Sequence, residues 1–221
     1  LLNPKTCKAD PDLLGHLGLS ASQLPHLQPA TEAAGGLRAE VGGRTGLTAG
    51  IPVGPAVHDQ YAAALGSGSV HPGDVMFGAG TAWVLMLVTD RLLPPVTPDT
   101  FVCPHPVDGL YGQLLSLVTG GSAFTWVREM LGMENRSSEE IDSILDDAPA
   151  GSDGLRFWPF MVSGGAEGLP PGMPGRLDGL RLSHEKGHVL RAVVEGLALE
   201  LSRYLGFFTD AGTAVDRKVV Q

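Results

Sequence analysis

Two apolar segments with a short glycine-rich stretch between them constrain the fold of this chain more than any other feature. Residues 73–77 (GDVMF) and 82–88 (AWVLMLV) favour β-strands, and only Gly78-Ala79-Gly80-Thr81 separates them, so the pattern predicts a β-hairpin. A glycine-threonine turn lets backbone N–H groups and a hydroxyl approach phosphate oxygens closely. Taken alone, Gly80-Thr81 fits an ordinary hairpin turn better than a phosphate site.

Helix signals alternate with strand signals on both sides of this hairpin. A strand candidate at residues 50–53 leads to residues 60–65, whose helix-forming side chains end at Gly66-Ser67-Gly68. The alternation indicates the α/β class, with a domain boundary near residue 68. The other expected helices cover residues 10–19 (N-cap Asp10), 37–46, 122–130, 139–145 and 183–207 (N-cap Ser183). Residues 111–118 are expected to form a strand or a short helix, residues 155–160 a strand, and a further strand begins near residue 215.

Charge and cysteine usage exclude several classes of protein. The 221 residues carry a formal net charge of −9 and no run of basic side chains, which argues against nucleic-acid binding. Cys7 and Cys103 lack the spacing of a thiolate zinc site and are expected to be free thiols in a reducing compartment. No apolar run approaches the roughly 20 residues that span a bilayer, and the first residues lack a signal-peptide pattern. The sequence therefore predicts a cytoplasmic protein that binds neither nucleic acid nor membrane.

The segment His184-Glu185-Lys186-Gly187-His188 matches the zinc-protease pattern H-E-x-x-H, in which two histidines one helical turn apart bind the metal. A catalytic zinc also needs a third protein ligand, which must come from another element. No H-x-x-G-x-x-H extension follows, and His184 falls in the first turn of the expected helix. Two ordinary helix histidines explain the segment better, and a zinc metallopeptidase is kept as the weakest alternative.

Two further segments carry residues that suit chemistry. Asp59 lies at a strand-to-helix junction, where a side chain is held rigidly yet faces a cleft. By itself such an aspartate is more often a helix cap than a catalyst. Thr119-Gly120-Gly121-Ser122 opens a helix, so it is either an anion site at the helix N-terminus or a tight turn. No Walker A sequence is present, which excludes a P-loop mechanism.

The order of these features along the chain resembles the FGGY family of carbohydrate kinases, and the likeness covers nearly the whole chain. GIPVGPAVHDQYAAALGSGSVHPGDVMFGAGTAWVLM (50–86) is similar to the stretch that joins the two domains of the family, where a catalytic aspartate precedes the phosphate hairpin of domain II. Xylulokinase-like members are the most similar. Three other segments match family motifs in the same order: TGGSAFTWVREML (119–131), DGLRFWPFMVSGGAEGLPPG (153–172) and LDGLRLSHEKGHVLRAVVEGLALEL (177–201).

The resemblance implies the actin-like ATPase (ribonuclease H-like) fold, with residues 1–68 as the C-terminal part of domain I and residues 69–221 as most of domain II. It implies an ATP-dependent kinase that transfers the γ-phosphate of ATP to a hydroxyl of a ketose or polyol, a xylulose-like sugar first. Mg²⁺ would accompany the ATP. The implied partners are the sugar, ATP and, for a homodimer, a second copy of the chain.

The same resemblance assigns a role to each matching position. Asp59 would be the general base that takes the proton from the attacking sugar hydroxyl, with His58 and Gln60 beside it binding the sugar. Thr81 and Gly80 would contact the transferring phosphate. No metal site is expected from the protein alone, since Mg²⁺ would arrive with ATP, near Asp59. The nucleotide-side residues would be Gly120, Gly121 and Thr125, next to a structural Trp126.

The chain also departs from the family pattern. Ala82 stands where the family usually has serine, Ala56 stands where it has glycine, and Ser163-Gly164-Gly165-Ala166-Glu167 lacks the family's arginine. The D-x-G-T phosphate loop of domain I is not found upstream of residue 50, and the chain stops where a GGG adenosine loop would follow. The sequence is therefore expected to be the central part of a longer kinase and to be inactive alone. A catalytically incomplete binding module with the same fold is the second alternative.

Overall fold

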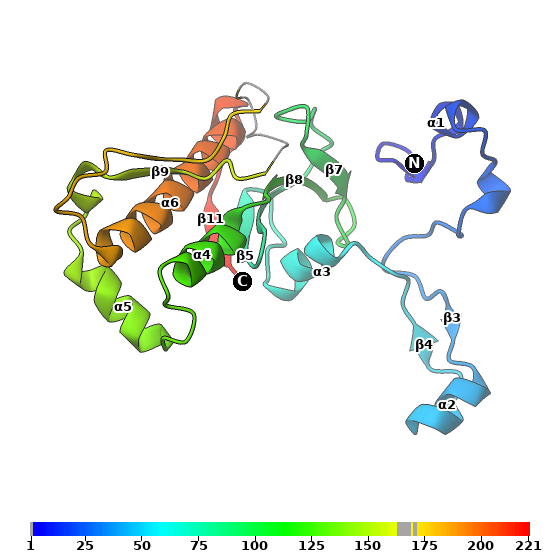
Figure 1. The fold of residues 1–221 in the computed structure, drawn as a ribbon. Coiled ribbons are helices and arrows are strands. Elements are labelled where there is room, and N and C mark those ends of the chain that lie inside the picture. The colour runs from blue at the N-terminus through cyan, green and yellow to red at the C-terminus, as the bar shows by residue number, and fades with distance from the viewer. Residues whose placement is uncertain (1, 163–168, 170–171) are drawn as a thin grey trace.

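The computed structural model describes residues 2–162, 169 and 172–221. A five-stranded mixed sheet forms the centre of the larger part of the chain, which confirms the predicted α/β class (Figure 1). The strand order is β11-β5-β6-β8-β7, and neighbouring strands are antiparallel except β11 and β5, which are parallel. The strands are β5 (Asp74–Ala79), β6 (Trp83–Thr89), β7 (Phe101–Pro104), β8 (Tyr111–Leu117) and β11 (Arg217–Val220).

The hairpin predicted from the two apolar segments is confirmed. β5 and β6 pair antiparallel along their length, with Ala79 opposite Trp83 at the end of the ladder. Ala79 thus belongs to β5, and the turn itself consists of Gly80, Thr81 and Ala82. The apolar segments supply the strands, and the glycine-rich stretch supplies the reversal of the chain.

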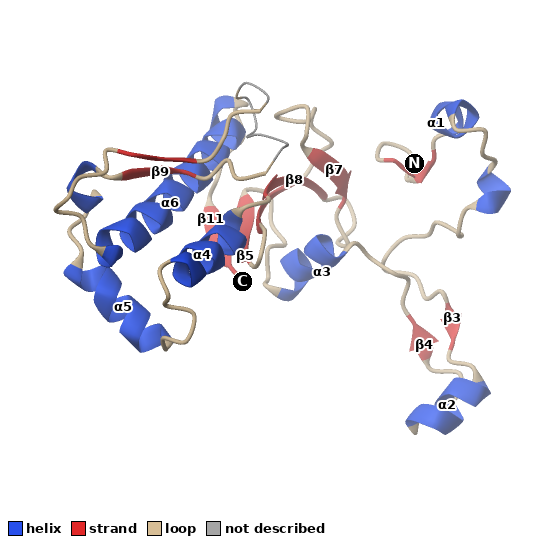
Figure 2. Ribbon diagram, in the orientation of Figure 1, coloured by secondary structure: helices blue, strands red, loops and turns tan. Residues whose placement is uncertain are grey.

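Residues of the central strands alternate between two apolar faces, because successive side chains of a strand point to opposite sides. α3 (Asp59–Gly66) covers one face, where Tyr61 and Ala64 pack against strand side chains. α4 (Gly120–Met130) and α6 (Lys186–Asp210) cover the other face (Figure 2). The first face presents Met76, Val84, Met86 and Leu114, and the second presents Val75, Leu85, Leu87, Leu115 and Leu117.

A second, two-stranded sheet packs closely against α6. β9 (Arg156–Trp158) and β10 (Arg176–Asp178) pair antiparallel beside the helix (Figure 1). A methyl group on Gly196 of α6 would overlap the carbonyl oxygen of Phe157 in β9. Glycine at this position therefore permits the close approach of helix and strand.

Arg191 connects α6 to α5 (Ser138–Asp147). Its Nε donates to Glu195 Oε1 at 2.9 Å, as the i,i+4 spacing predicts. Its Nη1 donates to the Leu145 carbonyl oxygen at 2.8 Å, and Glu195 Oε1 also accepts from the backbone N–H of Gly151 at 2.9 Å. This residue pair therefore holds three segments of the domain together.

The start of α6 differs from the prediction, because the helix begins at Lys186 and Ser183 does not cap it. Glu185 is the N-cap, with an extended backbone (φ −105°, ψ 174°), and its N–H donates to His188 Nδ1 at 3.1 Å. The helix ends at Asp210 rather than near residue 207. Neither this helix nor any other in the described part of the chain is long and apolar enough to cross a membrane.

Residues 2–57 contribute no strand to the central sheet as described and form only short elements (Figure 1). α1 (Pro11–His16) has Asp10 as its N-cap, as predicted, but ends at His16 rather than near residue 19. The Asp10 carboxylate accepts from the N–H groups of Asp12 and Leu13 at 3.1 and 3.2 Å. The remaining elements here are β1 (Leu2–Asn3), β2 (Lys8–Ala9), η1 (Ala21–Gln23), β3 (Gly35–Gly36), α2 (Ala39–Thr45) and β4 (Pro52–Val53), and η2 (Ser152–Gly154) lies farther along the chain.

A buried carboxylate joins the last strand to the start of β5. The Asp74 side chain is 4% exposed and accepts from Nε and Nη2 of Arg217 at 2.8 and 2.6 Å. It also accepts from the N–H groups of Val70 and His71 at 3.0 and 2.9 Å, and Arg217 donates further to the Gly68 carbonyl oxygen. The Arg217 guanidinium holds the pKa of Asp74 far below its usual range, because these bonds favour the charged carboxylate.

Glutamine in place of Arg217 is expected to lower the free energy of unfolding at neutral pH by about 2 kcal/mol, the effect of lost hydrogen bonds to a charged group. Because the folded-state pKa of Asp74 is depressed, this contribution is complete above the pKa of an unfolded aspartate and is lost as pH falls towards the folded-state value. Denaturant unfolding at about pH 7 and about pH 3 measures the difference, which should shrink on acidification. Arg44→Gln, at an exposed position in α2, is the control. An equal difference at both pH values would contradict the assignment.

Candidate active site

The glycine turn of the β5–β6 hairpin lies directly against the first residues of α4. The N–H of Ser122 donates to the Thr81 carbonyl oxygen at 2.9 Å. A methyl group on Gly121 would overlap the Gly80 carbonyl oxygen, so glycine is required for this contact. The structure thus brings together the turn and the helix start that the sequence placed in one site. The N-terminus of a helix carries partial positive charge, which favours an anion beside it.

The residues that begin α4 are fixed by packing. The helix begins at Gly120, two residues earlier than predicted, and a methyl group on Gly120 would overlap the Trp83 ring. Thr119 is 4% exposed, and its Oγ1 donates to the Pro159 carbonyl oxygen at 2.5 Å. Gly120 is buried, so of the three residues assigned to the nucleotide only Gly121 and Thr125 are accessible.

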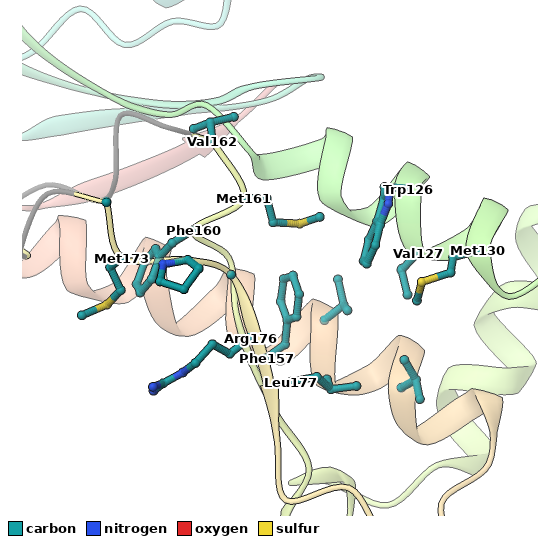
Figure 3. Close-up of a pocket in the computed structure, with 15 residues that line it drawn as sticks. Trp126, Val127, Met130, Phe157, Phe160, Met161, Val162, Met173, Arg176 and Leu177 are labelled. Carbon is teal, nitrogen blue, oxygen red and sulfur yellow. The ribbon is translucent and has the colours of Figure 1, made fainter.

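Thr125 lies one helical turn beyond Gly121 on α4, so the two residues share a face of the helix. Trp126, predicted to be structural, is 41% exposed. It lines an apolar cavity of about 640 Å³ between α4, α6 and the β9–β10 sheet. Figure 3 shows Trp126 on α4 across this cavity from Phe157 and Met161. Gly121 and Thr125, the accessible residues assigned to the nucleotide, do not line this cavity.

His58 and Asp59 start α3. His58, not Asp59, is the N-cap, and its Nδ1 accepts from the Gln60 N–H at 3.3 Å. The Asp59 side chain is 84% exposed, and its Oδ1 accepts from the same N–H at 2.7 Å and lies 3.2 Å from His58 Nδ1. A carboxylate fixed in the first turn of a helix and open to solvent can be reached by a substrate hydroxyl.

Gln60 places the start of α3 at the same end of the sheet as the glycine turn. Its Oε1 would lie 3.6 Å from a methyl group on Gly78, near the end of β5. Gly78 is two residues from Gly80, at the start of the turn. The structure therefore brings Gln60, and with it the start of α3 that carries Asp59, to the strand end that leads into Gly80 and Thr81.

The end of β11 also lies beside this turn, which the sequence did not predict. Gln221 donates from its N–H to the Phe77 carbonyl oxygen at 2.8 Å and accepts from the Ala79 N–H at 3.0 Å. Since β11 runs parallel to β5, its carboxyl end emerges at the turn. The sequence predicted a strand from residue 215 but not its partner, because the partners of a parallel pair are far apart in the chain.

The two histidines of the zinc-protease pattern bind backbone groups instead of a metal. Nδ1 of His184 accepts from the Arg181 N–H at 2.9 Å, Nδ1 of His188 accepts from the Glu185 N–H, and His188 Nε2 lies 3.5 Å from the Asp153 carboxylate. Across residues 2–162, 169 and 172–221, no group of three or more His, Cys, Asp or Glu side chains is placed to hold a metal ion. These described residues therefore give the zinc-peptidase alternative no support, and the segment starts a helix that packs against the sheet.

The residues that depart from the family pattern differ in their exposure to solvent. Ala82 closes the glycine turn and is half-buried, whereas Ala56 is exposed in the segment that leads to α3. The segment 163–167, which lacks the family's arginine, lies outside the described residues. Of Ala56 and Ala82, only Ala82 therefore belongs to the turn that contacts α4.

Solved structures identify the class defined by this sheet and its covering helices as the actin-like ATPase fold. The chain matches a xylulose kinase from Rhodospirillum rubrum with a TM-score of 0.81 at 30% identity, over 94% of this chain and 42% of that one. It matches a xylulose kinase from Brucella ovis with a TM-score of 0.83 at 26% identity, over 96% of this chain and 44% of that one.

The chain belongs to the FGGY family of carbohydrate kinases. The family models of the N-terminal and C-terminal domains match residues 1–66 and 75–220. Among curated relatives, the xylulose kinase of Bacillus subtilis (strain 168) is 25% identical over 92% of this chain, and the glycerol kinase of Alkalilimnicola ehrlichii is 29% identical over 93%. Each match covers 41% of the relative, so the chain spans about two-fifths of the length of these proteins.

Proposed function

We propose that the protein containing this chain is an ATP-dependent carbohydrate kinase, which transfers the γ-phosphate of ATP to a hydroxyl of a sugar or polyol. The observation that carries the proposal is the contact between the Gly80-Thr81 turn and the N-terminus of α4, at the end of the sheet where Asp59 is held. Membership of a family of carbohydrate kinases supports the reaction class.

In this proposal Asp59 is the general base. Its exposed carboxylate accepts the proton of the sugar hydroxyl as the oxygen attacks the γ-phosphate. His58 and Gln60, which flank it, hydrogen-bond the other hydroxyls of the sugar. Gly80 and Thr81 contact the transferring phosphoryl group with backbone N–H groups and one hydroxyl. Catalysis by such a site consists mainly of positioning and of stabilising charge.

The nucleotide is proposed to lie along the face of α4 that carries Gly121 and Thr125, with its phosphates directed at the turn. Mg²⁺ bound with ATP neutralises phosphate charge and needs few protein carboxylates, because it keeps several waters. Asp59 fits this requirement, since both of its contacts in the described part of the chain involve Oδ1. The other carboxylate oxygen of Asp59, Oδ2, is proposed to accept a hydrogen bond from a water bound to Mg²⁺.

The preferred substrate is proposed to be a ketose similar to xylulose. The relatives are named xylulose kinase, glycerol kinase, L-fuculokinase and gluconokinase, and the solved structures at 25% identity or more include several xylulose kinases. The division into residues 1–68 of domain I and 69–221 of domain II is part of the same proposal. The cytoplasmic location and the homodimer stay predictions.

An assay of ADP release with ATP, Mg²⁺ and a panel of acceptors tests this function in the full-length protein. Xylulose is expected to give a kcat/KM at least about tenfold above that with glycerol, because a site built to hydrogen-bond several hydroxyls discriminates against a shorter polyol. The reaction without acceptor is the control. ATP binding with no turnover of any ketose, polyol or aldonate would contradict the kinase and favour the catalytically incomplete binding module.

A further inference from the structure

We propose that Tyr61 and Gly112 form a positioning pair that fixes the candidate base Asp59 relative to the phosphate turn, an inference that rests on the proposed function. Tyr61 lies two residues beyond Asp59 on α3 and is 1% exposed. Its hydroxyl donates to the Gly112 carbonyl oxygen at 2.8 Å. Gly112 belongs to β8, so the pair attaches α3 to the central sheet.

The missing side chain at Gly112 makes room for the Tyr61 ring. A methyl group on Gly112 would lie 2.5 Å from Cε1 and 2.9 Å from Cζ of Tyr61, much closer than the 3.5–4.0 Å at which carbon atoms pack. The backbone of Gly112 is not in the left-handed region, so its conformation does not require glycine. A glycine inside a strand often marks a place where another group approaches closely, and here the tyrosine ring is that group.

Contacts of the Tyr61 ring lead directly to the candidate base. The ring packs edge-to-face on His58, with centroids 5.7 Å apart, and Phe101 of β7 stacks on His58 at 5.3 Å. His58 Nδ1 lies 3.2 Å from Asp59 Oδ1. A displacement of the Tyr61 ring therefore moves the residue that contacts the Asp59 carboxylate.

β8, which accepts the hydrogen bond of Tyr61 at Gly112, also pairs with the strand that follows the phosphate turn. β8 pairs with β6 over seven residue pairs, and the last of these places Leu117 opposite Trp83, two residues after Thr81. Gly112 and the turn thus belong to one hydrogen-bonded sheet. Burial raises the pKa of the Tyr61 hydroxyl above its usual value, so the hydroxyl remains a donor at physiological pH. The position of Asp59 relative to the turn is consequently set through Tyr61.

Steady-state kinetics of Gly112→Ala in the full-length protein test the pair. The added methyl group must displace the ring, and kcat is expected to fall about 100-fold, as for a misplacement of about 1 Å. KM for ATP should change less than about twofold, because ATP is assigned to α4 and not to α3. Tyr61→Leu in the same background removes the two crowded ring carbons, but also the hydroxyl and the ring contact with His58. It should therefore restore kcat only in part, by about tenfold. The matched variant Tyr61→Phe retains both carbons and should restore nothing.

Hydrogen exchange of the α3 amides reports on the pair without any need for activity. Gly112→Ala should accelerate exchange at residues 62–65, and the added substitution Tyr61→Leu should reverse part of this change. If the unmutated protein phosphorylates no acceptor, the proposed function fails, and exchange alone decides whether the pair docks α3. Unchanged kcat in Gly112→Ala, equal rescue by leucine and phenylalanine, or a parallel rise in KM for ATP without rescue would overturn the positioning role. Unchanged exchange would overturn the pair itself.

Discussion

Asparagine in place of Asp59 is expected to reduce sugar-dependent ADP release by about 100- to 10,000-fold, the range for a lost general base. Asparagine keeps the size of the side chain, and His58 rather than Asp59 caps α3, so the helix should be unchanged. ATP affinity, measured by calorimetry, should stay within about twofold, because the nucleotide is assigned to another helix. Turnover with the preferred sugar measures the loss.

Asp12→Asn is a matched control for this variant. Asp12 is also an exposed aspartate in the first turn of a helix, α1. Its replacement should leave ADP release unchanged, because α1 lies apart from the sheet that carries the turn (Figure 1). Full activity of Asp59→Asn would show that the role of the base is assigned to the wrong residue, even in a protein that is a kinase.

Alanine in place of Gly121 is expected to have the second-largest effect. Its methyl group would overlap the carbonyl oxygen of Gly80, and backbone cannot move aside as a flexible side chain can. α4 must then separate from the turn, so kcat/KM for ATP should fall about 100-fold. Overpacking at this contact should also lower the free energy of unfolding by about 1–3 kcal/mol. Kinetics with varied ATP and denaturant unfolding measure the two effects.

Gly206→Ala in α6 is the control for Gly121→Ala. It shows the effect of a glycine-to-alanine change in a helix where the added methyl group touches nothing. A methyl group on Gly206 has no neighbour within 4 Å, and alanine favours a helix over glycine by about 0.5–1 kcal/mol. This variant should therefore be slightly more stable and kinetically unchanged. If Gly121→Ala matched it in both respects, the contact between the turn and α4 would have no part in the site.

Elements with strong local patterns could be predicted from the sequence, and elements defined by distant partners could not. The β5–β6 hairpin follows from two apolar segments, and α1 follows from its Asp10 cap. β7 and β10 contain only four and three residues, too few for a recognisable alternation. Ser183 is a good capping residue, but the chain turns at residues 181–184, where the His184 N–H donates to the Arg181 carbonyl oxygen, so the helix starts later.

The candidate site shows the same division between local and distant information. Asp59, the Gly80-Thr81 turn and Gly121 could be placed in one site because their order along the chain resembles a family. The packing role of Gly120 depends on Trp83, and the role of Gly112 depends on Tyr61, 51 residues earlier. From the sequence alone, a glycine inside a strand indicates only that the strand is less stable there. Its partner becomes visible when the strand and the helix are placed in space.

Phosphorus NMR of the full-length protein with ATP, Mg²⁺ and xylulose tests whether Asp59 catalyses phosphoryl transfer to the sugar. A new sugar phosphomonoester resonance is expected to grow in equal amount with ADP, and to be absent when Asp59→Asn replaces the unmutated protein. ADP accompanied by inorganic phosphate alone, or the same ester formed at an unchanged rate by Asp59→Asn, would contradict this role of Asp59.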